Sequence, residues 1–256
     1  MLEAYTLFSG SSGNCVYIKT TGAEILVDCG KNAKTIEAAL KKLGSSLCNI
    51  SAIFITHEHS DHISALEVIS KRYKIPVHAA AATAARLGPY ARACVVEHAP
   101  RFMIETPHYA IRSFVTPHDS VVCVGYRITT DDGEIAIATD LGCVTDEAGI
   151  AMLGCHGVII ESNHDVEMLK TGPYPAELKR RILSREGHLS NDECAHLAAI
   201  LAKRGTKRLL LAHISRENNR PELALAATER ALEQALVRDA VVRRSEEHTS
   251  ELQSQF

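Results

Sequence analysis

Short apolar stretches and polar turns alternate along the first part of the chain. Residues 3–8, 15–19 and 24–28 are rich in β-branched and aromatic side chains, and turns containing glycine and serine or threonine separate them. This pattern predicts three strands that follow one another directly. A helix is expected next at 33–43, where apolar residues recur on one helical face, and a short buried strand at 51–56.

The rest of the chain repeats this alternation. Apolar positions at helical spacing predict four more helices, over residues 61–73, 79–87, 191–203 and 220–236. Apolar stretches rich in strand-forming residues predict five more strands, over residues 109–116, 121–129, 134–139, 157–161 and 208–212. Two β-rich halves with helices outside them predict the α/β (α+β) class, with an αββα sandwich in which two mixed β-sheets are flanked by helices.

The sequence predicts one domain followed by a short tail. No Pro- or Ser-rich linker interrupts residues 1–243, which we expect to fold as one unit. Residues 244–256 are polar, lack periodicity and look like the in-frame translation of a sequencing-library adapter. We therefore expect a disordered tail there, which belongs to no site.

Composition restricts where the protein works. Hydrophobic residues make up 46% of the chain, and no apolar stretch approaches the roughly 18 residues of a membrane helix. The first residues lack the basic segment of an export signal. The eight cysteines form no CxxC pair, which is typical of reduced thiols in a cytoplasmic protein. The net charge of −3 does not by itself indicate a nucleic-acid binder.

Candidate chemistry is concentrated in the segment 57–62, which reads His-Glu-His-Ser-Asp-His between a predicted strand and a predicted helix. In a loop, His57, His59, Asp61 and His62 can converge on one pocket. Imidazole nitrogens and carboxylate oxygens suit Zn²⁺, Mn²⁺ or iron, and four such ligands in one segment exceed what a single tetrahedral ion needs from it. The pattern therefore predicts two metal ions.

Three more ligand-type residues stand at the ends of predicted strands: His118, Asp140 and His213. Together with Asp28 and the segment 57–62 they occur in the order of the five motifs of the metallo-β-lactamase superfamily, which the sequence resembles over about residues 1–240. Longer motifs resemble the YycJ/WalJ branch of that superfamily, namely GSSGN at 10–14, TDLG at 139–142, ESNHD at 161–165, GHLSN at 187–191 and LAHISRENN at 211–219.

The resemblance implies a dinuclear metal hydrolase that uses zinc or manganese, with iron as a further candidate. The ligands carried over are His57, His59 and His118 for the first ion, Asp61, His62 and His213 for the second, and Asp140 as the bridge. Two ions held in this way can share a hydroxide that attacks the substrate. Asp28 is expected to orient the metal-binding loop through a hydrogen bond rather than to bind metal.

Further residues are candidates for work beyond metal binding. His188 can supply the proton that a leaving group needs. Together with the candidate metal ligands Asp61 and Asp140, it forms the expected catalytic set. The alternative is that His188 only precedes a helix cap formed by Ser190 or Asn191. Residues expected to support the ligands or to touch substrate are Ser11, Ser12, Asn14, His164 and Arg216.

These features favour a metal-dependent phosphodiesterase, namely a cytoplasmic 5′–3′ exonuclease that acts on nucleic acid, with DNA as the expected substrate and no membrane partner. The alternative is a small-molecule hydrolase of the same fold that acts on a thioester, a lactone or a cyclic phosphodiester, because fold and metal site do not fix the substrate. A third class, an iron-containing redox or sensor protein, is disfavoured by His62 and by the lack of an attached flavodoxin-like domain. The oligomeric state has no signature in the sequence.

Overall fold

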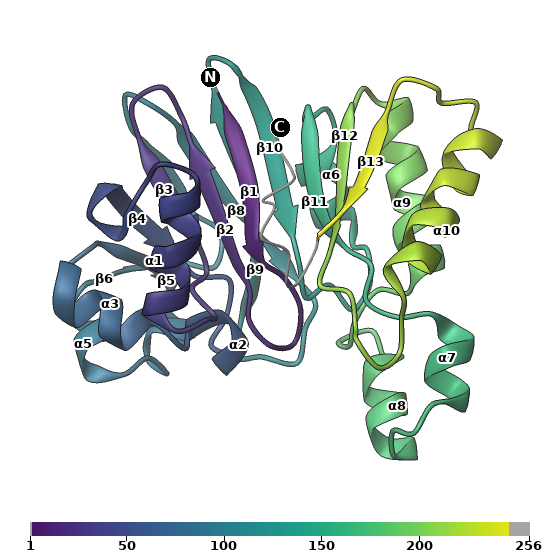
Figure 1. Cartoon of the computed structure of the whole chain (residues 1–256), viewed down its shortest axis with the longest axis horizontal. Helices are drawn as coiled ribbons and strands as arrows, with labels where there is room; N and C mark the ends of the chain where they lie inside the picture. The colour runs from purple at the N-terminus through teal and green to yellow at the C-terminus, as the bar shows by residue number, and fades with distance from the viewer. Residues whose placement is uncertain (1, 246–256) are drawn as a thin grey trace.

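Two β-sheets pack face to face in the computed structural model, which describes residues 2–245 (Figure 1). The strands of the first sheet are, in order, β1 (Glu3–Phe8), β2 (Cys15–Lys19), β3 (Glu24–Val27), β4 (Ile50–Phe54), β5 (Val77–Ala80) and β6 (Val95–His98). Those of the second are β13 (Val241–Arg244), β12 (Arg208–Ala212), β11 (Gly157–Glu161), β10 (Gly133–Ala138), β9 (Cys123–Thr130), β8 (Ala110–Thr116) and β7 (Met103–Glu105).

Both sheets combine antiparallel and parallel pairs. In the first sheet, β1 to β3 pair antiparallel and β3 to β6 pair parallel. In the second sheet, β7 to β10 pair antiparallel and β10 to β13 pair parallel. The predicted architecture of two mixed sheets is therefore confirmed.

Helices cover both outer faces of the sandwich (Figure 1). Those outside the first sheet are α1 (Ala33–Lys42), α3 (Leu66–Tyr73) and α5 (Pro89–Arg92), and those outside the second are α6 (Asp146–Met152), α9 (Asn191–Lys203) and α10 (Pro221–Gln234). Shorter elements are the 3₁₀ turn η1 (Leu47–Asn49), α2 (Ser60–Ile63) and α4 (Ala81–Ala84). Figure 1 also shows α7 (Val166–Thr171) and α8 (Ala176–Ile182) projecting beyond the sheets. Within residues 2–245, none of the helices has the length and apolar character needed to cross a membrane.

Apolar side chains fill three layers. Ile18 and Phe54 are fully buried between the sheets, Ile36 and Leu40 of α1 pack on the outside of the first sheet, and Leu201 of α9 packs on the outside of the second. Successive residues of β2 and of β11 enter opposite layers, so these central strands are buried on both faces. Dense packing on both sides fixes the positions of the strand ends.

Two predicted helices differ from the structure. The helix predicted at 79–87 is wrong, because its first residues belong to β5 and only Ala81–Ala84 are helical. Alanine favours helices, but Val77 and Ala79 are buried in the core where β5 pairs with β4 and β6, and this tertiary pairing overrides the local preference. The helix predicted at 61–73 is broken between α2 and α3.

Besides β5, three strands that the sequence did not predict form sheet edges, namely β6, β7 and β13. Arg244 is the last residue of β13 and is paired with Leu211 of β12, although the predicted domain boundary placed it in the tail. Ser245 also contacts β12, since its N–H donates to the Leu211 carbonyl oxygen. The rest of the predicted tail, residues 246–256, lies outside the described residues.

Candidate metal centre

The ligand-type residues stand where strands of both sheets end along one edge of the sandwich. The segment 57–62 follows β4 and includes the first turn of α2. In the second sheet β8, β10 and β12 run in the same direction. The residues that follow the ends of these three strands are His118, Asp140 and His213.

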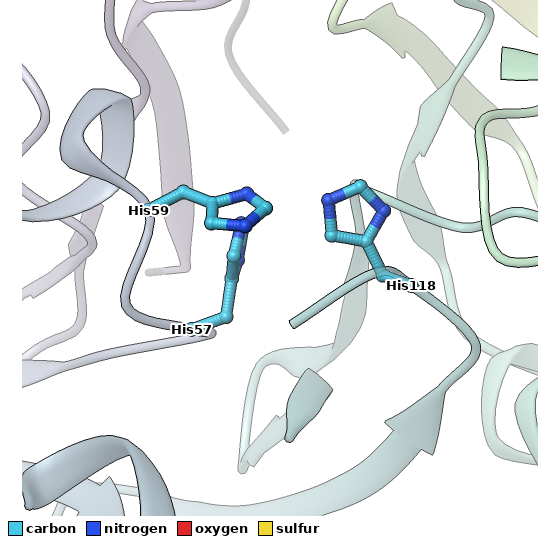
Figure 2. Close-up of side chains that lie close together, drawn as sticks. All are labelled: His57, His59 and His118. Carbon is cyan, nitrogen blue, oxygen red and sulfur yellow. The ribbon is translucent and has the colours of Figure 1, made fainter. Parts of the chain in front are cut away.

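The structure brings all seven predicted ligands into one continuous cluster. Figure 2 shows His57 and His59 on one side and His118 facing them from the loop after β8. Ligand nitrogens of these three residues lie within 4.8 Å of one another. Three further groups meet the same limit. They are His57, His62 and Asp140; Asp61, His62 and His213; and Asp140, Glu161, His188 and His213.

Three residues at the site have a left-handed backbone: Asp28 (φ 60°), Asp140 (φ 54°) and His213 (φ 52°). This conformation costs a residue other than glycine about 1–3 kcal/mol and persists only where neighbours hold it. At His213, the N–H donates to Ser9 Oγ at 2.6 Å, and the carbonyl oxygen accepts from Asn163 Nδ2 at 3.0 Å. The backbone N–H and the carbonyl oxygen of His213 are therefore both held by side chains of other residues.

Asp28 contacts the segment 57–62 and the preceding Thr56 through its carboxylate. Its carboxylate accepts hydrogen bonds from the Thr56 N–H (2.9 Å), the Thr56 hydroxyl (2.8 Å) and His62 Nδ1 (2.8 Å). Burial lowers the pKa of His62, but the carboxylates of Asp140 and Asp28 outweigh it and raise that pKa to about 10. These contacts fit the orienting role that the sequence suggested for Asp28.

Two candidate ligand atoms have no hydrogen-bond partner within residues 2–245. They are His57 Nε2 and His213 Nε2, both buried, where an unpaired polar atom is costly. Burial lowers the pKa of His57 well below its usual value, so this ring is neutral. Burial raises the pKa of Asp140, but His213 and His62 outweigh it and hold that pKa well below its usual value. Imidazole nitrogens and carboxylate oxygens are donor types that divalent metal ions bind, so the gathered donor set indicates divalent metal binding.

Glu161 is a buried member of the site to which sequence reasoning gave no role. Its Oε1 accepts hydrogen bonds from His188 Nδ1 and His213 Nδ1, each at 2.7 Å, and its Oε2 accepts from the N–H groups of Leu141 and Leu189. Burial raises the pKa of Glu161, but His188 and His213 outweigh it and lower that pKa to about 2. The available signal was a single carboxylate at the end of β11, a strand whose other residues are all uncharged and buried.

Buried asparagines connect the loops after β11 and β12 with the start of α9. Asn219 Nδ2 donates to the carbonyl oxygens of Ser162 and Asn163 at 3.0 Å and to Asn191 Oδ1 at 2.8 Å. Asn219 Oδ1 in turn accepts from Asn191 Nδ2 at 2.9 Å. Because these loops carry the glutamate and histidines described above, the network fixes their relative positions.

A cavity of about 220 Å³ lies over the cluster, and Ser11 lines it as expected for a residue near substrate. Asn14 is buried, with Nδ2 2.9 Å from His62 Nε2, so it supports a candidate ligand instead. Ser12 accepts a hydrogen bond from Lys31 Nζ at 2.7 Å. Of the three residues predicted in this turn, only Ser11 therefore lines the cavity, whereas Asn14 contacts His62 and Ser12 contacts Lys31.

Two predicted contact residues stand apart from the cavity lining. His164 is buried, neither ring nitrogen has a hydrogen-bond partner among the described residues, and burial lowers its pKa. Arg216 is exposed on the loop after β12. A larger cavity of about 730 Å³ lies beside α6 on the outer face of the second sheet and contains no predicted site residue.

Comparison with known proteins identifies the family. Residues 23–214 match the family model of the beta-lactamase superfamily domain. Exodeoxyribonuclease YycJ of Bacillus anthracis is 35% identical over 237 residues, which cover 91% of this chain and 90% of that protein. Exodeoxyribonuclease WalJ of Streptococcus pneumoniae is 37% identical over 224 residues, which cover 85% of this chain and 83% of that protein. The metallo-beta-lactamase fold protein YhfI from Bacillus subtilis shares the fold, with a TM-score of 0.70 at 17% identity over 97% of both chains. The chain therefore belongs to the metallo-β-lactamase superfamily and, within it, to the YycJ/WalJ family.

Proposed function

We propose that the protein is a metal-dependent 5′–3′ exonuclease that acts on DNA. The observation that carries the proposal is one cavity lined both by candidate metal ligands and by His188, whose ring is held by Glu161. The relatives named exodeoxyribonuclease, 35% and 37% identical over most of their length, support nucleic acid as the substrate and DNA in particular.

In this proposal two divalent ions, zinc or manganese, occupy the cluster. The residues that would hold them are His57, His59 and His118 for one, Asp61, His62 and His213 for the other, and Asp140 for both. The two carboxylate oxygens of Asp140 support bridging, because Oδ2 lies 3.2 Å from His62 Nε2 and Oδ1 lies 3.7 Å from His118 Nε2. Bound ions would acidify a water molecule and offset negative charge on the phosphodiester.

His188 serves as the general acid in this proposal. Its Nδ1 lies 2.7 Å from Glu161 Oε1 and 3.9 Å from Asp140 Oδ1, and its side chain lines the cavity. Burial lowers the pKa of His188, but Glu161 outweighs it and raises that pKa above its usual value. The protonated form of the ring is therefore favoured more than in a free imidazole. Since Nδ1 is bound to Glu161, Nε2 is the atom that delivers a proton to the leaving oxygen.

The proposed exonuclease activity can be tested by asking whether DNA cleavage requires a free strand end. Metal-loaded protein is incubated with linear single- and double-stranded DNA carrying 5′-phosphates, and with closed circles of the same sequence as controls. The proposal predicts release of mononucleotides from the 5′ end of linear DNA and intact circles. It also predicts a steep loss of activity with added salt, because contacts to phosphates release counterions. Cleavage of the circles would contradict the requirement for an end.

The same experiment can instead indicate a small-molecule hydrolase of the same fold. Protein shown to contain metal would leave linear DNA untouched and hydrolyse a lactone, a thioester or a cyclic phosphodiester with little dependence on salt. That outcome would overturn the proposal for DNA while retaining the metal centre.

A further inference from the structure

The cavity over the candidate ligands has one apolar wall, which the projecting segment 166–187 supplies. The wall residues are Tyr174, Leu178 and Ile182, from the α7–α8 turn and from α8, the helix pair that stands beyond the sheets in Figure 1. Among the described residues that line the cavity, Tyr174 is the only Phe, Tyr or Trp. A phosphodiester group needs polar neighbours alone, so an aromatic wall points to a second part of the ligand that is flat and apolar.

The turn that presents Tyr174 has little conformational freedom. Pro173 and Pro175 stand on either side of it, and each proline fixes its own φ while restricting the residue before it to extended conformations. The Gly172 N–H donates to the Met168 carbonyl oxygen at 2.7 Å, and a Cβ at Gly172 would lie only 2.6 Å from that oxygen, so the close approach requires glycine. A ring held on such a turn loses little entropy when it binds a ligand.

We propose that Tyr174 stacks on the nucleobase of the terminal nucleotide and thereby favours a strand end. This inference rests on the proposed nuclease function. At about 220 Å³ the cavity is smaller than the roughly 300–1,000 Å³ of common ligand sites, so it has room for a single nucleotide unit rather than for a duplex. Stacking on an aromatic ring accepts any base, because every base has a π face. The ion pair of Arg181 with Asp119 offsets a carboxylate at the cavity that would otherwise repel phosphate.

The experiment combines ring variants with DNA ends that lack a base. Tyr174→Ala, Tyr174→Phe and the unaltered protein are given 5′-phosphorylated single-stranded oligonucleotides whose terminal nucleotides are either normal or abasic at both ends. Tyr174→Ala is expected to raise KM on normal ends about 5- to 150-fold with little change in kcat, which is the range for loss of one base–aromatic stack. Tyr174→Phe keeps the original KM. Tyr90→Ala is the matched control, because Tyr90 is 44% exposed on α5 and does not line the cavity.

The abasic ends separate stacking from structural damage. On these ends the unaltered protein has the raised KM, and Tyr174→Ala adds no further increase. An unchanged KM of Tyr174→Ala on normal ends overturns the inference, and so does an equal loss on normal and abasic ends, because either result removes the coupling between ring and base. If the unaltered, metal-loaded protein releases nucleotides from neither substrate, the nuclease function itself is wrong and the inference falls with it.

Discussion

The two sheets contribute to the site in different ways. The first sheet supplies one short segment, 57–62, whose His62 and backbone are held by Asp28. The second sheet supplies residues from the ends of separate strands and from the loops that follow them, namely His118, Asp140, Glu161, His188 and His213. The first half is therefore a local unit, whereas the second half depends on the hydrogen bonds that connect its loops.

This difference predicts how each half responds to substitution. A change in the segment 57–62 should act mainly through the residue that is replaced. In the second half, a change at Asn219, which no candidate ligand contacts directly, should still disturb them, because its amide holds the loops together.

Removing a ligand from the first half should have the largest effect. His59→Ala is expected to reduce DNA cleavage to background, well beyond the roughly 10–100-fold loss typical of residues that only support ligands. Metal content, measured by elemental analysis, should fall in the same samples. Ser60→Ala is the matched control, because Ser60 is exposed in the same segment. Full activity of His59→Ala would show that the loop is not the metal site.

Removing the proposed acid from the second half should separate metal binding from catalysis. His188→Ala is expected to lower kcat by about 10²- to 10⁴-fold, the usual contribution of a general acid, while the metal content stays unchanged. Single-turnover cleavage and elemental analysis on one preparation provide the check. A lost metal ion would make His188 a ligand, and an unchanged rate would remove it from the mechanism.

Substitutions at the buried carboxylates Asp28 and Glu161 compare the two halves of the site directly. Asp28→Asn is expected to weaken metal affinity by about 10- to 100-fold, with kcat recovered at saturating metal, because Asp28 acts on the loop alone. Glu161→Gln should retain a lowered kcat even at saturating metal, because Glu161 also holds His188. Activity is titrated against metal concentration for both variants. If both variants recovered full kcat at saturating metal, or neither did, the proposed difference between Asp28 and Glu161 would be wrong.

Breaking the asparagine network should give the smallest effect and should show mainly in stability. Asn219→Ala leaves the buried Ser162 carbonyl oxygen without its side-chain donor, whereas the Asn163 carbonyl oxygen still accepts from the Ser215 N–H. The unpaired group costs about 1–3 kcal/mol in the free energy of unfolding. For a chain of this size the melting temperature should fall by about 2–4 °C per kcal/mol. Asn49→Ala, at an exposed position, serves as the control and should change stability by less than about 0.5 kcal/mol. A melting temperature equal to that of the control would dismiss the network as a structural element.

The first half of the site and most of the fold could be predicted from the sequence because their signals are local. The bounds predicted for α9 and β12 agree with the structure, since an amphipathic pattern with a capping box formed by Ser190 and Glu193 identifies the helix. The segment 57–62 carries its ligand types within one loop. Local patterns of this kind need no knowledge of distant partners.

The remaining features depend on contacts between distant residues. Glu161 looks like an ordinary strand end in the sequence, and its partners His188 and His213 lie 27 and 52 residues away. The stretch 79–87 has the composition of a helix, yet pairing with neighbouring strands makes its start a strand. Tyr174 lines the cavity only because the turn before α8 and α8 itself border the candidate ligands, which are distant in sequence.

In the proposed site both halves hold two metal ions through Asp140, so the metal stoichiometry is the decisive measurement. The unaltered protein, Asp140→Ala and Asp140→Asn are loaded with manganese or zinc, passed through gel filtration and submitted to elemental analysis. Asparagine is included because it tolerates the left-handed backbone at this position. We predict about two ions per unaltered chain and fewer than one in either variant, with unchanged circular dichroism. Equal metal content in all three proteins, or none in the unaltered chain, would contradict the account.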